Sequence, residues 1–219
     1  QELLKKYDEL AQAIFIDMFG DPGKNEKGWK KRKGYEIIKV VGGGTFRSDD
    51  YIEKGIPLIR IGAVNKGYFD KTQLVFLPES YKTTYSKYLV YSGDILITLT
   101  GTVGKDDYGN IFILNDEYSE YLLNQRVAKL EIDQSCLSKK YFEYLLKQKQ
   151  IKSELTDVSR GVRQANISNT DIYELNIPIP PIEIQLGFES IVNKIGKLAN
   201  LYSGNHSFVL FDSLIKKAF

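Results

Sequence analysis

A polar loop near residue 160 carries side chains that are well suited to recognise a base-paired nucleic acid. They are Arg160, Arg163, Gln164 and Asn166. No acidic residue falls between positions 159 and 169. Arginine places two donors on guanine, and asparagine or glutamine offers adenine one donor and one acceptor. We therefore predict contacts with base edges, the alternative being that either arginine forms a salt bridge with Asp157 or Asp171.

A second polar turn follows three consecutive glycines at 42–44. Thr45, Arg47 and Ser48 come directly after them and form the second candidate DNA-binding group. The alternative is a structural turn in which Arg47 pairs with Asp49 or Asp50. Because Gly42 to Gly44 lack the G-x-G-x-x-G spacing, we interpret them as a flexible turn and not as a dinucleotide site.

A third group surrounds Gly101 and is rich in hydroxyl groups. Its members are Thr98, Thr100, Thr102 and Lys105, which could contact DNA phosphates. The segment Gly101 to Lys105 has some likeness to a phosphate-binding loop. However, residue 99 is leucine and residue 106 is aspartate, so the P-loop spacing fails.

Several kinds of catalysis are excluded by what the chain lacks. His206 is its only histidine, which excludes a histidine-rich zinc site and an HNH-like nuclease. No lysine has Asp or Glu two residues before it, as many restriction nucleases require. The carboxylates of Asp94, Asp106 and Asp107 have no neighbour that marks them as acid or base. We expect a protein that is not an enzyme by itself and binds neither metal nor cofactor.

The overall composition is that of an ordinary soluble protein of 219 residues. No apolar run approaches the ~20 residues of a membrane span, so we expect no membrane. One cysteine, Cys136, permits no internal disulfide and fits a reducing cytoplasm. With a net charge of only +2, DNA binding must rest on local patches. Residues 24–33 hold six basic residues around Trp29 and are either such a patch or a solvated loop.

Short β-like runs fill the middle of the chain and are separated by glycine, proline and asparagine turns. They span residues 36–41, 56–61, 74–77, 94–100, 111–114 and 126–132. Ser138 is the expected N-cap of one helix over 139–155. The pattern predicts a mixed α/β (α+β) fold, strand-rich and without internal repeats.

Two amphipathic helices are predicted at the ends of this body, over 2–19 and after Pro181. Their apolar seams are Leu3, Tyr7, Leu10 and Ile14 in the first, and Ile184, Phe188, Ile191, Ile195 and Leu198 in the second. Prolines 178, 180 and 181 separate the body from the second helix. We predict an N-terminal helix at 1–20, a globular domain at 21–180 and a helical spacer or dimerisation region at 181–219, with the helices antiparallel.

The ordered set of motifs closely resembles the DNA-specificity subunit of type I restriction–modification systems. It runs through Gly55-Ile-Pro-Leu-Ile-Arg60, Gly93-Asp-Ile-Leu-Ile97, Gly101-Thr-Val-Gly104, Asn124-Gln-Arg126, Gly161 to Ser168, and Ile177-Pro-Ile-Pro-Pro181 through Gln185. Phe15 to Pro22 and Leu214 to Phe219 are similar to the family's two helix ends. Each piece alone is weak evidence, but their order is specific and covers nearly the whole chain.

The resemblance implies a target recognition domain that reads one half of a bipartite site in double-stranded DNA. It also implies modification subunits that methylate adenine with S-adenosylmethionine, and a separate restriction and translocase subunit that uses ATP. Both cofactors would belong to those partner subunits. A complete family subunit carries two recognition domains, and this chain has one. We therefore expect a fragment, or a half-size subunit that forms a homodimer.

Two alternatives remain open at this stage. The chain could be the recognition domain of a fused restriction enzyme and methyltransferase, which requires an upstream Asn/Asp-Pro-Pro-Tyr/Phe segment. It could instead be an α/β domain that binds another ligand or a protein. Binding to bipartite DNA over a salt series distinguishes the last alternative from a DNA reader.

Overall fold

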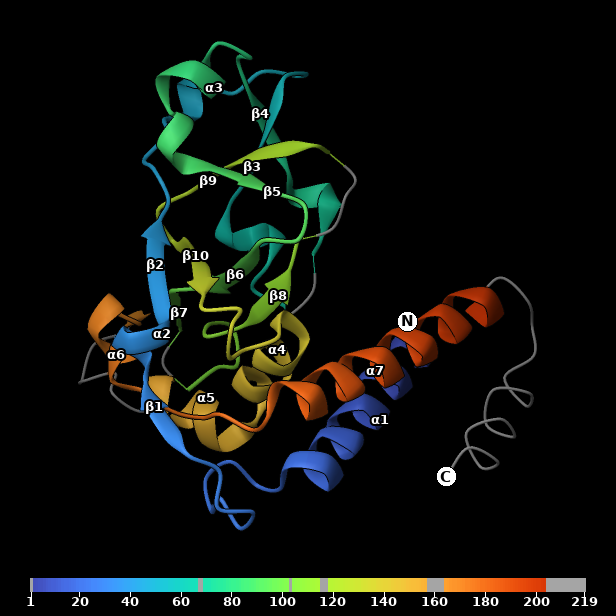
Figure 1. Cartoon of the computed structure of the whole chain (residues 1–219). Helices are drawn as coiled ribbons and strands as arrows, with labels where there is room; N and C mark the ends of the chain where they lie inside the picture. The colour runs from blue at the N-terminus through green and yellow to red at the C-terminus, as the bar shows by residue number, and fades with distance from the viewer. Residues whose placement is uncertain (1, 67–68, 103, 115–117, 157–163, 204–219) are drawn as a thin grey trace.

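Two stacked four-stranded sheets and a layer of helices form the body, and two long helices project from its base (Figure 1). This computed structural model describes residues 2–66, 69–102, 104–114, 118–156 and 164–203. The mixed α/β fold predicted from the sequence is confirmed. None of the helices in these ranges is long and apolar enough to cross a membrane.

The upper sheet has the strand order β4-β3-β9-β5. Its strands are β3 (Ile56–Ile59), β4 (Val75–Leu77), β5 (Leu89–Tyr91) and β9 (Glu120–Leu123). β3 and β9 are parallel, and the other two pairs are antiparallel. All four residues of β3 are buried, because the lower sheet covers one face and aromatic side chains of α3 (Tyr81–Thr84) and its surroundings cover the other. The short 3-10 helices η1 (Ser48–Asp50), η2 (Ile61–Ala63), η3 (Lys71–Gln73) and η4 (Ser86–Tyr88) connect these elements.

The lower sheet is wholly antiparallel, with the order β2-β10-β6-β8. Its strands are β2 (Ile38–Gly42), β6 (Ile95–Thr98), β8 (Ile111–Ile113) and β10 (Val127–Ile132). The predicted strand at 36–41 is wrong at its start, where the short helix α2 (Gly34–Ile37) lies. The Glu36 carboxylate accepts a hydrogen bond from the Lys33 backbone N–H at 3.0 Å, and this capping interaction favours a helical turn.

Two small strand pairs join distant parts of the chain. β7 (Thr100–Thr102) pairs with β11 (Gln164–Asn166), and β1 (Lys31–Lys33) pairs with β12 (Asn176–Pro178). Part of the basic segment 24–33 is therefore a strand. Two side chains of this strand form ion pairs, Arg32 with Glu36 and Lys33 with Glu174, and Lys24 pairs with Glu26 within the segment.

Helices cover the lower sheet on the face away from the upper one. They are α4 (Lys139–Lys147), α5 (Lys149–Thr156) and the short α6 (Asn169–Glu174). The single helix predicted for 139–155 is wrong, because Gln148 is extended with ψ 133° and separates α4 from α5. Its side-chain amide donates to the Tyr144 carbonyl at 3.0 Å, which stabilises the C-terminus of α4.

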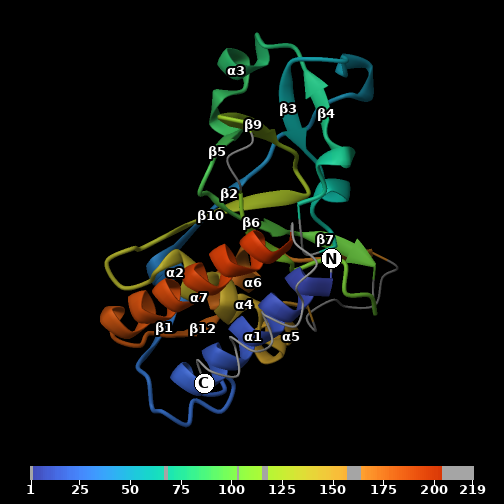
Figure 2. The same ribbon diagram turned by 90° about the vertical axis from the view of Figure 1, so that its right-hand side faces the viewer.

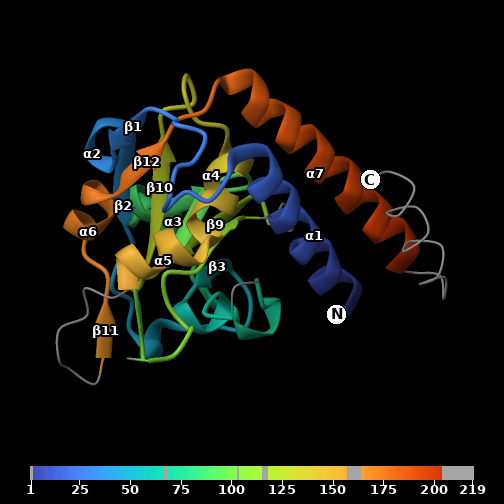
Figure 3. The same cartoon turned by 90° about the horizontal axis from the view of Figure 1, so that it is seen from below.

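The two long helices, α1 (Glu2–Phe19) and α7 (Ile182–Ser203), pack antiparallel. Figures 1 and 3 show them extending away from the body, and Figure 2 looks toward their projecting ends. α1 ends at Gly20, whose φ of +77° suits a residue without a side chain. Seen from below in Figure 3, this helix pair and β11 lie on opposite sides of α4 and α5.

Candidate nucleic-acid interface

The pairing of β7 with β11 brings together two of the three predicted contact groups. Thr100 lies opposite Asn166 and Thr102 opposite Gln164, although the partners are more than sixty residues apart in sequence. Thr102 and Asn166 are exposed, and Thr100 is half-buried. We call these two strands the β7–β11 edge. Of the same predicted loop, Arg160 and Arg163 lie outside the described residues, as does the side chain of Gln164.

The β7–β11 edge is held in place by the loop that follows β7. The Asp107 carboxylate accepts a hydrogen bond from the Thr102 backbone N–H at 2.8 Å. Asp107 and the ring of Tyr108 lie so close to Gly101 that a Cβ there would overlap with them. The Ile167 N–H donates to the Leu99 carbonyl at 2.8 Å and fixes the far end of the pair. The motif around Gly101 therefore serves close packing of the edge.

The glycine turn at 42–45 is fixed by the Asn124-Gln125-Arg126 motif. The Thr45 hydroxyl donates to the Gln125 side-chain carbonyl at 2.7 Å. The Gln125 backbone N–H donates to the Gly44 carbonyl at 2.8 Å. The Tyr88 ring packs on Gly44, where an added Cβ would lie 2.5 Å from a ring carbon. The motif thus positions Thr45, a predicted contact residue. The proton of the Thr45 hydroxyl is already donated to Gln125, so this hydroxyl can offer DNA only an acceptor.

An open concavity of about 300 Å³ lies beside β7, the first strand of the β7–β11 edge. Arg126 lies next to Gln125 in sequence and lines this concavity together with Thr100 and Thr102. Arg126 is exposed, and within the described part of the chain it has no carboxylate partner. Its guanidinium can therefore donate two parallel hydrogen bonds to guanine or to a phosphate. Asn65 and Asp107 complete the polar lining.

The remaining predicted contact residues fall into two groups. Arg47, Ser48 and Lys105 are exposed. No ion pair joins Arg47 to Asp49 or Asp50 in the structure as described, so its charge faces solvent. Thr98 was wrongly expected at the surface. It is fully buried, and its hydroxyl accepts the Asn110 backbone N–H at 2.9 Å.

The described residues contain no group of three or more histidine, cysteine or acidic side chains that could hold a metal ion. What the concavity offers is hydrogen-bond donors, hydroxyl groups, the positive charge of Arg126 and one carboxylate, Asp107, which accepts the Thr102 backbone N–H. This chemistry suits recognition of a polar, negatively charged surface.

The proline segment connects this body to α7 through one buried amide. Gln185 is completely buried, and its side-chain carbonyl accepts the Ser138 N–H at 2.8 Å. Its amide nitrogen donates to the carbonyls of Cys136 and Pro180, both at 2.8 Å. Ser138 is the N-cap of α4, so Gln185 ties the starts of α4 and α7 together. The Tyr141 hydroxyl adds a bond of 2.8 Å to the Pro178 carbonyl.

Comparison with known proteins decides the family. A family model described as the type I restriction modification DNA specificity domain matches residues 26–201. The chain belongs to this family. The resemblance inferred from the order of the motifs is therefore confirmed.

One relative of this specificity-domain family is the type I restriction enzyme MjaVIII specificity subunit of Methanocaldococcus jannaschii. It is 27% identical over 181 residues, which cover 82% of this chain and 42% of that protein. A structure described under complex assembly and conformational transition of the type I R-M system has a TM-score of 0.60 at 18% identity, covering 99% of this chain and 48% of that one. The type I S subunit from M. genitalium has a TM-score of 0.53 at 18% identity, covering 80% and 40%.

At these identities the solved structures establish a shared fold. The chain spans less than half the length of each of these three proteins. What a complete specificity subunit does in its complex is therefore a matter of proposal for this chain.

The helix pair of this specificity domain is formed within one chain. Seam residues that we predicted as partner contacts pack inside this chain. Ile14, Phe188 and Ile195 are buried in the core, and Tyr7 is half-buried. The Phe188 ring lies 5.6 Å from that of Phe15. Leu10, Ile184 and Ile191 also pack against this core. Leu198 is 38% exposed, and the side chain of Leu3 lies outside the described residues.

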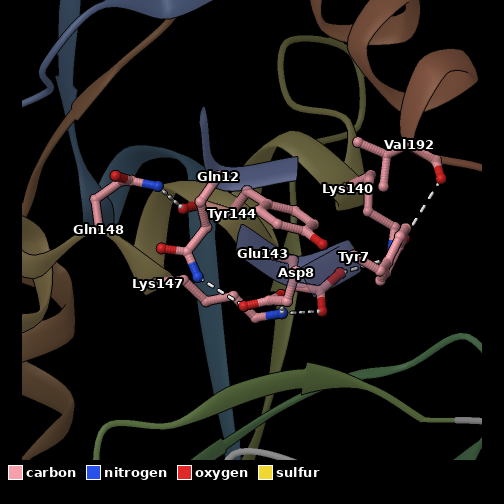
Figure 4. A network of polar contacts seen from close by, with 9 residues as sticks. All are labelled: Tyr7, Asp8, Gln12, Lys140, Glu143, Tyr144, Lys147, Gln148 and Val192. Atoms are coloured by element: carbon pink, nitrogen blue, oxygen red, sulfur yellow. Dashed lines mark hydrogen bonds and ion pairs between the residues drawn. The ribbon is translucent and has the colours of Figure 1, made fainter. Parts of the chain in front are cut away.

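A network of polar groups connects α1 to α4 beneath α7 (Figure 4). The Lys147 ammonium lies 3.3 Å from Asp8 and 3.0 Å from Glu143, whose carboxylate is almost fully buried. Burial lowers the pKa of Lys147, but the attraction of Glu143 and Asp8 outweighs it and leaves that pKa above its ordinary value. Burial also raises the pKa of Tyr144 beside it. Lys147 is thus kept charged at neutral pH.

Two residues were not singled out from the sequence: Arg126 in the candidate interface, and Gln185 at the junction between the proline segment and α7. Arg126 was noted only as part of a family motif, and Gln185 only as the end of the proline segment. Both depend on pairings between distant segments, for which the chain carries no local signal. The exposed charge of Arg126 at a strand start was the one available hint.

Proposed function

We propose that this chain is the DNA-reading part of a type I restriction–modification specificity subunit. It binds double-stranded DNA and recognises one half of a bipartite site. The observation that supports this most is the convergence of Thr45, Arg126, Thr100 and Asn166 on one surface, from four segments far apart in sequence. All four are residue types that pair with base edges or phosphates.

In this proposal the surface makes two kinds of contact with DNA, one with base edges and one with phosphates. Asn166 is exposed on β11 and reads a base edge, with adenine as the matching base. The loop containing Arg160, Arg163 and Gln164 supplies further base contacts. Arg47, Ser48, Thr102 and Lys105 hold the phosphates on either side and fix the register.

The helix pair acts as a spacer between two such reading domains. α7 has 22 residues, and at 1.5 Å per residue it is about 33 Å long. This is close to the ~34–36 Å of one turn of B-DNA that separates half-sites in many dimeric readers. The hydrogen bonds of Gln185 would set the angle between head and spacer, and the helix length would set the number of unread base pairs.

The second reading domain comes either from a second copy of this chain or from a longer protein. We favour the homodimer, with two-fold symmetry and hence a palindromic bipartite target. Most of the seam between α1 and α7 is covered internally, so the dimer must use the apolar groups still exposed. Ile16 is 40% exposed and Leu186 53%. Light scattering at micromolar concentration tests this, and a monomer would refute it.

The chemistry of the complex resides in the partner subunits. Modification subunits transfer a methyl group from S-adenosylmethionine to adenine, and a restriction and translocase subunit uses ATP. This chain binds neither cofactor, contributes no catalytic residue and works in the cytoplasm. Its role is to place the target adenine within reach of the methyltransferase.

Selection from random duplex DNA, combined with three substitutions, tests the proposed function. Asn166→Ala should relax the preference at one base pair, with a loss of about 1–3 kcal/mol of discrimination there. Lys105→Ala should weaken binding evenly across sequences. Asn193→Ala on the exposed side of α7 is the control and should change neither. If Asn166→Ala and Lys105→Ala weaken all sequences equally, the division into base and phosphate contacts is wrong.

A further inference from the structure

A second concave surface lies beside the reading surface and is lined by lysines. It has a volume of about 860 Å³ and lies between α1, α5 and the loop that joins β7 to β8. Its lining includes Lys105, Lys147, Lys149 and Lys152, and among the described residues Asp106 is the one acidic side chain there. We call it the lysine groove.

The four lysines differ in what they already bind. Lys147 is held by Asp8 and Glu143. Lys152 donates to the Asp106 carboxylate and, at 2.6 Å, to the side-chain carbonyl of Asn110. Lys105 and Lys149 are exposed, and no carboxylate pairs with either of them among the described residues. Among the described residues the groove therefore presents two charges without a carboxylate partner, Lys105 from the loop after β7 and Lys149 from the start of α5.

The groove is continuous with the β7–β11 edge through a single loop. The Lys105 N–H donates to the Thr102 carbonyl at 3.0 Å, so this lysine lies one turn beyond the edge. Asp106 lines the groove, whereas the next residue, Asp107, lines the concavity beside Arg126. A duplex that occupies the reading surface would therefore pass over the groove as it continues.

We propose that the lysine groove binds the phosphate backbone of the DNA next to the half-site. Lys105 contacts phosphates from the loop after β7, and Lys149 contacts them from the start of α5. Lys152 is a positioning residue, because it holds the loop of Lys105 through Asp106. Isolated ammonium groups on an open surface suit phosphates, which lysine binds as a point charge. This inference rests on the proposed function and extends it to DNA whose sequence is not read.

The salt dependence of DNA affinity measures these contacts directly. Each phosphate contact contributes about −0.9 to the slope of log affinity against log salt concentration. The assembled complex is titrated with its selected target and with a random-sequence duplex, from about 50 to about 200 mM salt. Over this range, Lys149→Ala should reduce the loss of affinity by about 3-fold, equally for both duplexes. Lys54→Ala, an exposed lysine in the turn before β3, is the matched control and should leave the slope unchanged.

Lys152→Met separates positioning from simple charge. It should reduce the slope in the wild-type background and have no further effect in the Lys105→Ala background. If the slope is unchanged in Lys149→Ala while the wild type still binds DNA in a salt-dependent manner, the lysine groove does not bind DNA phosphates. The proposed function would not be affected by that result. If Lys149→Ala weakens the binding of an acidic partner protein and leaves DNA affinity unchanged, the proposal that the groove binds phosphates is also overturned. Absence of salt-dependent binding in the wild type would instead refute the proposed function.

Discussion

Replacing Gln185 by leucine tests how the head is joined to the spacer helix. Leucine has a similar volume and keeps the site filled, but it cannot form the three hydrogen bonds of 2.8 Å that Gln185 makes. The substitution leaves the Ser138 N–H and the carbonyls of Cys136 and Pro180 without these partners. Because Gln185 is fully buried, water does not replace it without local opening.

The expected cost follows from the number of groups left unpaired. Each buried polar group without a partner costs about 1–3 kcal/mol, and Cys136 is only half-buried. We therefore expect Gln185→Leu to lower the free energy of unfolding by about 3–5 kcal/mol. For a protein of this size that corresponds to a melting temperature lower by roughly 10 °C.

Gln185→Glu sharpens the test because it places an acid beside two carbonyl oxygens. A charged carboxylate there is repelled by both, so its pKa in the folded protein should be raised above the unfolded value. The folded state then binds more protons, and the stability of this variant should fall as pH rises through that range. Urea and thermal unfolding followed by circular dichroism measure both effects. Asn193→Ala, at an exposed position of the same helix, is the control.

A Gln185→Leu protein whose stability lies within about 0.5 kcal/mol of the wild type would refute this reasoning. It would mean that the prolines alone fix the start of α7. A Gln185→Glu protein with the same pH dependence as the wild type would refute the assigned donors and acceptors.

Three further predictions concern the spacer, the glycine turn and acid stability. Lys147→Met should cost about 1–2 kcal/mol in urea unfolding, because the almost fully buried Glu143 then keeps only Lys140 as an ion-pair partner and Asp8 loses its ion pair; an unchanged unfolding midpoint would contradict this. Gly44→Ala should weaken DNA binding by displacing an aromatic ring, whereas Gly42→Ala, where an added Cβ meets nothing within 4 Å, should be neutral in the same binding assay. The hydrogen bond from Lys39 lowers the pKa of Glu131, so its contribution to stability should be lost as pH falls below about 4.5; Glu131→Gln should flatten that acid limb of the stability curve, and an equally steep limb would refute it.

Local patterns predicted the elements whose cause is local. The apolar spacing in α1 and α7 and the glycine after Phe19 specify those helices, and the N-cap Ser138 marks the start of α4. The break at Gln148 was missed because it results from a side-chain bond to the preceding helical turn. β9 was missed because its sequence has no strong alternation and is buried between both neighbours of the upper sheet.

The sequence predicted the separate contact groups of the candidate interface. It did not predict that these groups lie together on one surface. The residue types around Thr100 and Asn166 identified two contact groups from chemistry alone. That these groups form one surface depends on the β7–β11 pairing, which joins segments more than sixty residues apart. The role of Arg126 follows from the same assembly. Pairing over such separations depends on the whole core and leaves no trace in a short stretch of sequence.

The central claim is that this chain reads one half of a bipartite DNA site. The most direct measurement is selection of binding sequences from a random duplex library by the chain together with its cognate modification subunit. Our account predicts an enriched target with two short specified blocks and an unread spacer between them, and the loss of one base preference in Asn166→Ala. A library from which no sequence is enriched, with affinity that does not depend on salt, would contradict it.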